Sequence, residues 1–294
     1  MTTIDLGPAR PALPDEPWAG APRRIALTLP ELTHACSVLD APLPFEVVAA
    51  TKGGGLEGRL GQSRSSRQDD AFAAATAALG DPAASLTRRG LLDGAALDAG
   101  LAGALGLLAA PEVAIDLDVT IAGLRAHAWH RRRGDVVATL ATSDGLVFEL
   151  SWFPADGWSG ELGRTPALPE DISLTTSQVP DHLEVPFGLA DAVFEATRAG
   201  RGDLVPVLTS GDATLTTVLT ALTSESRGRL RAIVASVSDP ESAPIGVVSW
   251  TLVGDGWRAL RPVVRDGEPM LTVTRVEPSD LGPELAPVLA EVIR

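Results

Sequence analysis

Residues 127–135 read HAWHRRRGD and residues 248–255 read VSWTLVGD, so in both places a tryptophan precedes a Gly-Asp pair. The likeness continues at further positions: Asp144-Gly145 matches Asp266-Gly267, Pro154-Ala155-Asp156 matches Pro278-Ser279-Asp280, Ile25–Thr28 matches Ile172–Thr175, and Pro44-Phe45 matches Pro186-Phe187. The spacing is too long for a solenoid, whose units run about 20–50 residues. These matches predict a duplicated half and a pseudo-symmetric molecule.

Each half is expected to combine helices with an antiparallel meander. In residues 113–121, apolar residues alternate with Asp116, Asp118 and Thr120, as in a strand with one buried face. The other expected strands are 24–29, 123–131, 136–141, 146–153, 172–175, 230–238, 245–253, 257–264 and 270–276. The expected helices follow Thr28, Asp69-Asp70 and Asp93 or Asp98, and span about 189–199, 214–224 and 281–293. This order predicts an α+β fold with helices packed on an antiparallel sheet.

The chain divides into three predicted segments. Residues 1–23 are rich in proline and are expected to form a flexible tail. The N-terminal half covers 24–165, and the C-terminal half covers 166–294. The polar, glycine-rich stretch from Thr51 to Gln68 is expected to be a mobile loop.

Charge and cysteine content limit the classes of function. The 294 residues carry a net charge of −14, which argues against nucleic acid and anionic membrane partners. Cys36 is the only cysteine, which fits a reducing cytoplasm. The start of the chain lacks the apolar core of a signal peptide, and no apolar stretch is long enough to predict a transmembrane helix. We therefore expect a cytoplasmic protein.

The candidates for chemistry each have a simpler structural interpretation. Asp116 and Asp118 resemble metal-binding carboxylates, but strand alternation explains both positions. His127 and His130 are expected on opposite faces of one strand, so they do not share a metal. Gly53-Gly54-Gly55 lacks the Lys-Ser/Thr that follows the glycines of a phosphate loop. Cys36 lies on the apolar stripe of a helix and is expected to be buried. We predict no catalytic, cofactor-binding or metal-binding residues and no enzymatic activity.

One strand of the second half has apolar residues on both faces. Val248, Trp250 and Leu252 share one face of the predicted strand 245–253, and Val247 and Val253 share the other. Such a strand is either covered on both sides or presents a binding surface. We predict Val248, Trp250, Leu252 and Arg275 as partner-binding residues.

Two segments of the chain resemble the EspG family of chaperones of actinobacterial type VII (ESX) secretion systems. They are Arg89–Gly94, followed by a Leu/Ala-rich helix ending in Ala110-Pro111-Glu112, and Asp255–Pro262. The resemblance implies a quasi-two-fold α+β body around an antiparallel sheet. It implies binding of PE–PPE heterodimers at the helical tip of the PPE subunit, through the sheet and the helices of the C-terminal half.

Three functions are open from the sequence. The first is a cytosolic chaperone for a PE–PPE-like or other ESX-secreted client. The second is an enzyme that holds a metal through Asp116, Asp118 and a histidine. The third is a small-ligand binder or assembly scaffold of the same fold, with a pocket beside Trp129 or Trp250.

Overall fold

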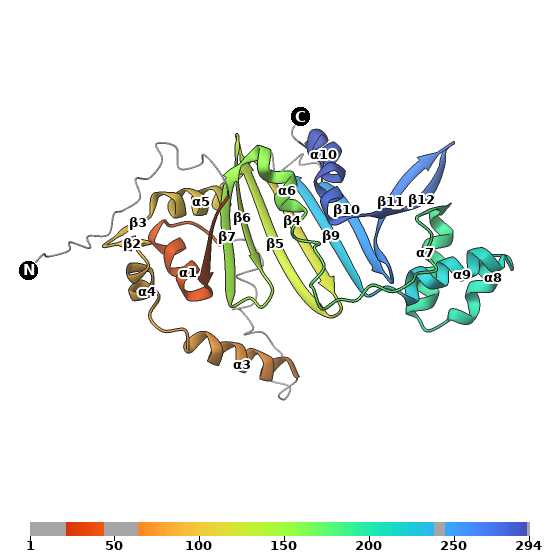
Figure 1. Ribbon diagram of the computed structural model, residues 1–294, viewed down its shortest axis with the longest axis horizontal. Helices are drawn as coiled ribbons and strands as arrows, with labels where there is room; N and C mark the ends of the chain where they lie inside the picture. The colour runs from red at the N-terminus through yellow and green to blue at the C-terminus, as the bar shows by residue number, and fades with distance from the viewer. Residues whose placement is uncertain (1–21, 44–63, 238–244, 293–294) are drawn as a thin grey trace, which may run out of the picture.

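The computed structural model describes residues 22–43, 64–237 and 245–292. Its centre is a ten-stranded antiparallel sheet in the order β1-β7-β6-β5-β4-β9-β10-β11-β12-β8 (Figure 1). The strands are β1 Arg23–Thr28, β4 Val113–Ile121, β5 Leu124–Arg133, β6 Val136–Thr142, β7 Val147–Pro154, β8 His182–Pro186, β9 Gly228–Ser236, β10 Ile245–Val253, β11 Gly256–Arg265 and β12 Glu268–Val276. The short pair β2 Leu92–Asp93 and β3 Ala96–Leu97 forms a separate ribbon.

The helices lie in the connections between these strands. They are α1 Leu29–Val38, α3 Arg64–Ala77, α4 Pro82–Arg88, α5 Ala99–Ala109, α6 Trp158–Leu162, α7 Phe187–Arg198, α8 Val205–Leu208, α9 Ala213–Ser224 and α10 Leu281–Val292. Short 3-10 turns are η2 Ala155–Gly157, η3 Gly202–Leu204 and η4 Pro278–Asp280. No helix among the described residues is long and apolar enough to cross a bilayer.

The sheet order is symmetric about its centre. β4 and β9 are neighbours, with Leu117 opposite Ala232. Moving outward, the first half adds β5, β6, β7 and β1, and the second half adds β10, β11, β12 and β8. The predicted pseudo-two-fold α+β fold is therefore confirmed. The division after residue 165 falls between α6 and β8 and stays a prediction, because both halves share one sheet.

Local sequence explains the helix starts and hairpin turns. Thr28 caps α1 in a capping box with Glu31, and the carboxylate of Asp98 accepts from the first backbone amides of α5. The β11–β12 hairpin closes through Asp266 and Gly267, with φ of 52° and 84°. Positive φ at both central residues is the requirement of a two-residue type I′ turn, which Asp-Gly meets well.

Two of the sequence matches are wrong. Residues 172–175 form no strand; the place equivalent to β1 is taken by β8, whose pairing with β12 mirrors that of β1 with β7. Trp129 and Trp250 are also not equivalent, because they pack on opposite faces of the sheet. A shift of one residue reverses the face of a strand residue, so the apparent tryptophan match was out of register. The Pro44-Phe45 match, residues 51–63 of the predicted loop with Gly53-Gly54-Gly55, and residues 1–21 of the predicted tail lie outside the described residues. The last part of the predicted loop, residues 64–68, is wrong: it forms the start of α3, so that helix begins before the expected cap at Asp69-Asp70.

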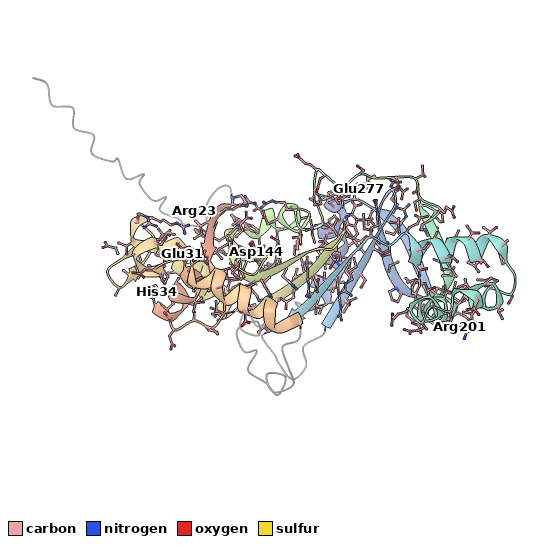
Figure 2. The ribbon with its side chains drawn as sticks, turned by 90° about the horizontal axis from the view of Figure 1, so that it is seen from below. Arg23, Glu31, His34, Asp144, Arg201 and Glu277 are labelled. Carbon is pink, nitrogen blue, oxygen red and sulfur yellow. The ribbon has the colours of Figure 1, made fainter. Side chains whose placement is uncertain are left out.

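The helices cover different parts of the two faces. α1, α4 and α5 pack on β1, β7, β6 and Trp129 of β5, in the first half. α7, α8 and α9 pack on β8, β12 and the end of β10, on the same side of the sheet. α6 and α10 cover the centre of the opposite side, over the odd-numbered residues of β4 such as Leu117. In Figure 2, His34 of α1 and Arg201 beside η3 mark the two helical ends.

Candidate functional site

Between the two helical ends, the described residues leave one side of the central strands uncovered. We call this surface the open face; it carries Asp116 and Asp118 of β4, Arg229, Arg231 and Ile233 of β9, and Val247 and Ser249 of β10. Because side chains alternate along a strand, these side chains lie on one face of the sheet, and the residues buried under α6 and α10 lie on the other face. Arg229 and Arg231 are exposed and Ile233 is half-buried, whereas Leu230, Ala232 and Val234 between them are buried.

An apolar pair lies within the open face. Val247 is directly opposite Ile233, which is in turn opposite Asp116. Val247 is 50% exposed, although it lies on a strand inside the sheet. An exposed apolar pair between two helical flanks is suited to burial by a partner.

The carboxylates of the open face are paired with arginines. Arg131 Nη1 lies 2.6 Å from Asp116 Oδ1, and Arg125 Nη2 lies 2.7 Å from Asp118 Oδ2. Burial opposes ionisation of Asp118, but the hydrogen bond and charge of Arg125 outweigh it and lower the pKa of Asp118. Both carboxylates therefore work as ion-pair partners in this arrangement.

A cavity of about 350 Å³ lies at the second-half end of the open face. Its walls come from α7 and α9, with Phe194 and Leu222, and its floor comes from Thr251 of β10 and Leu260 of β11. The open face therefore ends against a hollow lined by helices of the C-terminal half.

Of the predicted partner-binding residues, Trp250 and Leu252 are buried, whereas Val248 and Arg275 both line a groove at the surface. Trp250 and Leu252 are 1% and 0% exposed, and the indole of Trp250 donates to Glu284 of α10 at 3.0 Å. Val248 is half-buried on the same side, and it lines a groove of about 670 Å³ beside α10 to which Val247 and Arg275 also contribute. Partner binding by these residues stays a prediction, but a partner reaches Trp250 and Leu252 only by displacing α10.

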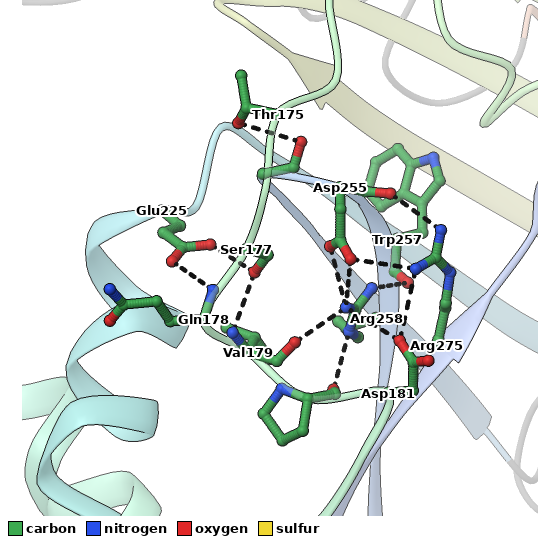
Figure 3. Close-up of polar contacts among 12 residues, drawn as sticks. Thr175, Ser177, Gln178, Val179, Asp181, Glu225, Asp255, Trp257, Arg258 and Arg275 are labelled. Carbon is green, nitrogen blue, oxygen red and sulfur yellow. Dashed lines mark hydrogen bonds and ion pairs between the residues drawn. The ribbon is translucent and has the colours of Figure 1, made fainter. Parts of the chain in front are cut away.

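Arg275 lies on the other side of the sheet. It pairs with Asp255 at 3.1 Å and with Asp181 at 3.4 Å, next to the fully buried Arg258 (Figure 3). Of the four predicted residues, Arg275 is therefore the one that shares the side of the open face. Sequence reasoning did not find Ile233, Arg229 or Arg231, although the alternation in residues 228–234 was a usable signal.

A second cavity, of about 460 Å³, lies in the first half on the α6 side of the sheet. His130, Thr139 and Glu161 line it together with small residues such as Ala128 and Ala141. His130 is 2% exposed, and burial lowers its pKa to about 3. Neither Trp129 nor Trp250 lines this cavity, so it is not the tryptophan-lined pocket expected from the sequence.

The histidines of β5 and the single cysteine have different surroundings and do not form one site. His127 stacks on Trp129 with ring centroids 5.9 Å apart, while His130 lies on the opposite side of β5. Within the described part of the chain, no three His, Cys, Asp or Glu side chains gather as metal ligands. Burial raises the pKa of the Cys36 thiol to about 11.

Among the described residues, helices cover the sheet at both ends and leave one side of its centre exposed, an α+β architecture with a candidate docking face. The sequence pattern of the EspG family matches residues 61–286, so the chain belongs to the EspG family. A comparison with curated proteins gave no match.

Among solved structures, the chain is similar to the Mycobacterium tuberculosis type VII secretion system chaperone EspG5 in complex with the PE25-PPE41 dimer. The TM-score is 0.60 at 13% identity, over 92% of this chain and 97% of that chain. At this identity the likeness concerns the fold.

Proposed function

We propose that the protein is a cytoplasmic chaperone of a type VII secretion system that binds a PE–PPE-like heterodimer and keeps it soluble. The observation that carries this proposal is the open face, with the Ile233–Val247 pair, in a member of the EspG family. The similar EspG5 structure holds a PE25-PPE41 dimer, which supports a client of the same type.

The proposed work is binding, with no bond made or broken. A client with an apolar helical tip would bury Ile233 and Val247, and the helices at both ends would limit its sideways movement. The hollow beside Phe194 and Leu222 would accept a protruding side chain of the client. Arg275 and its partner Asp255 lie on the same side of the sheet and would contact the edge of the client.

Co-expression with the PE–PPE-like pairs encoded nearest to this protein tests the proposal. Size-exclusion chromatography should show a stable complex with at least one pair. Val247→Asp should abolish co-elution without unfolding the chaperone, because the side chain of Val247 is 50% exposed. A lone monomer peak with every candidate pair would contradict the proposal.

The cavity beside His130 favours a second candidate function, the binding of a small uncharged ligand. Its volume is within the range of small-molecule sites. Its lining combines alanines with His130 and Thr139, and Arg164 pairs with Glu149 and Glu161 at its edge, which leaves an uncharged ligand as the suitable occupant. Quenching of tryptophan fluorescence by a metabolite panel tests this candidate, because Trp158 contacts His130 directly. No quenching at millimolar ligand would remove it.

A further inference from the structure

One strand of the open face carries a row of arginines that form no ion pair with the carboxylates of the described residues. Arg227, Arg229 and Arg231 alternate along β9 and its first flanking residue, and so project from the same side. The three form what we call the arginine row. It lies at the centre of the sheet, since β9 pairs with β4 on one side and β10 on the other.

The arginine row differs from the other arginines of the open face in its partners. Arg125 and Arg131 are paired with Asp118 and Asp116. By contrast, within the described residues Arg229 and Arg231 form no hydrogen bond or ion pair. Arg229 contributes only a longer-range attraction to Asp118.

Arg227 is held by the backbone and not by a carboxylate. Its Nη1 and Nη2 donate to the carbonyls of Ser173 and Gly254, at 3.1 and 2.9 Å. Its Nε is buried without a hydrogen-bond partner in the described structure. Because this atom is buried, a docked client does not reach it, and Arg227 contributes its positive charge to the row and not a free hydrogen-bond donor.

The neighbouring strands provide one carboxylate beside these two arginines, and it already has a partner. The register places Arg231 between Asp118 and Ser249, and Arg229 between Thr120 and Thr251. The only carboxylate in these two rows, Asp118, is already bonded to Arg125. The centre of the open face is therefore cationic, although the chain as a whole carries −14.

We propose that the arginine row binds acidic side chains on the tip of the protein client, around the apolar contact of Ile233 and Val247. This inference rests on the proposed function and specifies the client as one whose tip is apolar at its centre and acidic beside it. Arginine is suited to this role because its planar guanidinium binds carboxylates in a bidentate manner. The acidic body of the protein would repel a client that lacks this arrangement, so the row also contributes specificity.

The strong net negative charge disfavours a nucleic acid as the occupant. Phosphate binding is driven by the release of counterions from a broadly basic surface. Here three arginines are surrounded by an acidic body, which suits a few carboxylates better than a polyanion.

The test uses the full chain and the PE–PPE-like pair that co-elutes with it. Affinity is measured by calorimetry at 50, 150 and 500 mM NaCl for the wild type, R229E/R231E and R229Q/R231Q. We expect charge reversal to weaken binding at least about tenfold at low salt, and the glutamine variant to flatten the salt dependence. R229K/R231K should retain most of the salt dependence.

Arg133→Glu is the matched control. Arg133 is exposed and lies at the far end of β5, where the strand turns into β6, and among the described residues it forms no ion pair. It reverses one charge outside the open face, half of the charge change in R229E/R231E, so the affinity of this variant for the client should stay within about twofold of the wild type. Thermal unfolding of each variant confirms that the fold is intact.

The outcomes separate the two proposals. Equal, salt-independent affinity of all variants for the client would overturn the arginine-row inference and leave the chaperone function standing. Absence of any client complex with the wild type would contradict the chaperone function itself. Binding of a single-stranded RNA probe that is lost in R229E/R231E, with no protein client, would overturn both.

Discussion

The indole Nε1 of Trp158 donates a hydrogen bond to Nδ1 of His130, across 3.1 Å. Because an indole can only donate, Nδ1 must carry a lone pair, and the single proton of the neutral imidazole lies on Nε2. The contact joins α6 to β5 in a place where His130 is almost completely buried. It therefore depends on a neutral histidine.

The first prediction concerns acid stability. His130 has a folded pKa of about 3 against an ordinary 6.5, so between these values the unfolded chain binds a proton that the folded chain does not. Stability is complete above about pH 6.5 and is lost as the pH falls toward 3, by about 2 kcal/mol at pH 5. His130→Gln retains an acceptor for Trp158 but cannot titrate, so it should lack this part of the loss.

Urea unfolding at pH 7, 6, 5 and 4.5 gives the free energy of unfolding of the wild type and of His130→Gln. The effect of His130 is the difference between these two free energies at each pH. Carboxylates titrate in both proteins and cancel in that difference. His182→Gln is the control, because His182 is exposed on β8. A wild-type-minus-variant difference that stays constant over this pH range would contradict the prediction.

A second prediction concerns the seam between the halves. Gly228 begins β9 opposite Ile121 of β4, and a Cβ atom there would lie 2.4 Å from the carbonyl oxygen of Thr120. Backbone cannot rotate away as a side chain can, so Gly228→Ala should separate β4 from β9 and cost about 2 kcal/mol or more. Chemical denaturation measures the loss.

Gly106→Ala provides the opposite control. Gly106 lies within α5, and a Cβ there meets no atom within 4 Å. Alanine should therefore stabilise the protein by about 0.5–1 kcal/mol through helix propensity. If both variants shift stability in the same direction, steric conflict at the seam is not the cause.

The third prediction explains part of the Asp255–Pro262 motif. Arg258 is fully buried, and its guanidinium donates to the carbonyls of Pro180 and Val179 and to the carboxylate of Asp255 (Figure 3). Arg258→Met leaves these acceptors unpaired and should cost about 3–5 kcal/mol. Arg258→Lys should recover little, since one ammonium cannot reach the same acceptors in the same plane.

Thermal unfolding compares these variants with Arg265→Met. Arg265 is exposed and pairs with Glu184 at 3.0 Å, so its loss should cost at most about 1 kcal/mol. Equal losses at the two positions would show that Arg258 stabilises no more than a surface ion pair.

The strands and hairpins of the meanders were predictable because their signals are local. Alternation in residues 113–121 predicted β4 with the bounds that the structure has, and Asp266-Gly267 predicted a turn that needs positive φ. β8 was missed because it is five residues long and its partner β12 follows about 90 residues later, so nothing near it in sequence marks the pairing. The strand predicted at 172–175 is wrong because it depended on the match to residues 25–28 and not on a pairing partner.

The candidate site was predictable only in part. Sequence alternation separated Val248, Trp250 and Leu252 from Val247, but it does not say which set a helix covers. That choice depends on Glu284 and its helix α10, which follow Trp250 by 34 residues and bond its indole. In the sequence, Ile233 and Val247 have the pattern of core residues. Only the positions of the helices at both ends of the sheet show that these two side chains remain partly exposed.

The last prediction separates the open face from the face covered by α10. Trp250→Phe removes the hydrogen bond to Glu284 and some buried area, so it should lower the unfolding free energy by about 1–3 kcal/mol. Client affinity should change little, because Trp250 is 1% exposed and lies under α10. Val247→Asp should do the reverse: it places a charge in the apolar pair with Ile233 and abolishes binding, while unfolding changes by less than about 1 kcal/mol. Titrating the client against both variants, with unfolding curves alongside, gives the two effects independently. Loss of binding in Trp250→Phe with binding retained in Val247→Asp would move the client to the α10 side and restore Trp250 and Leu252 as contact residues.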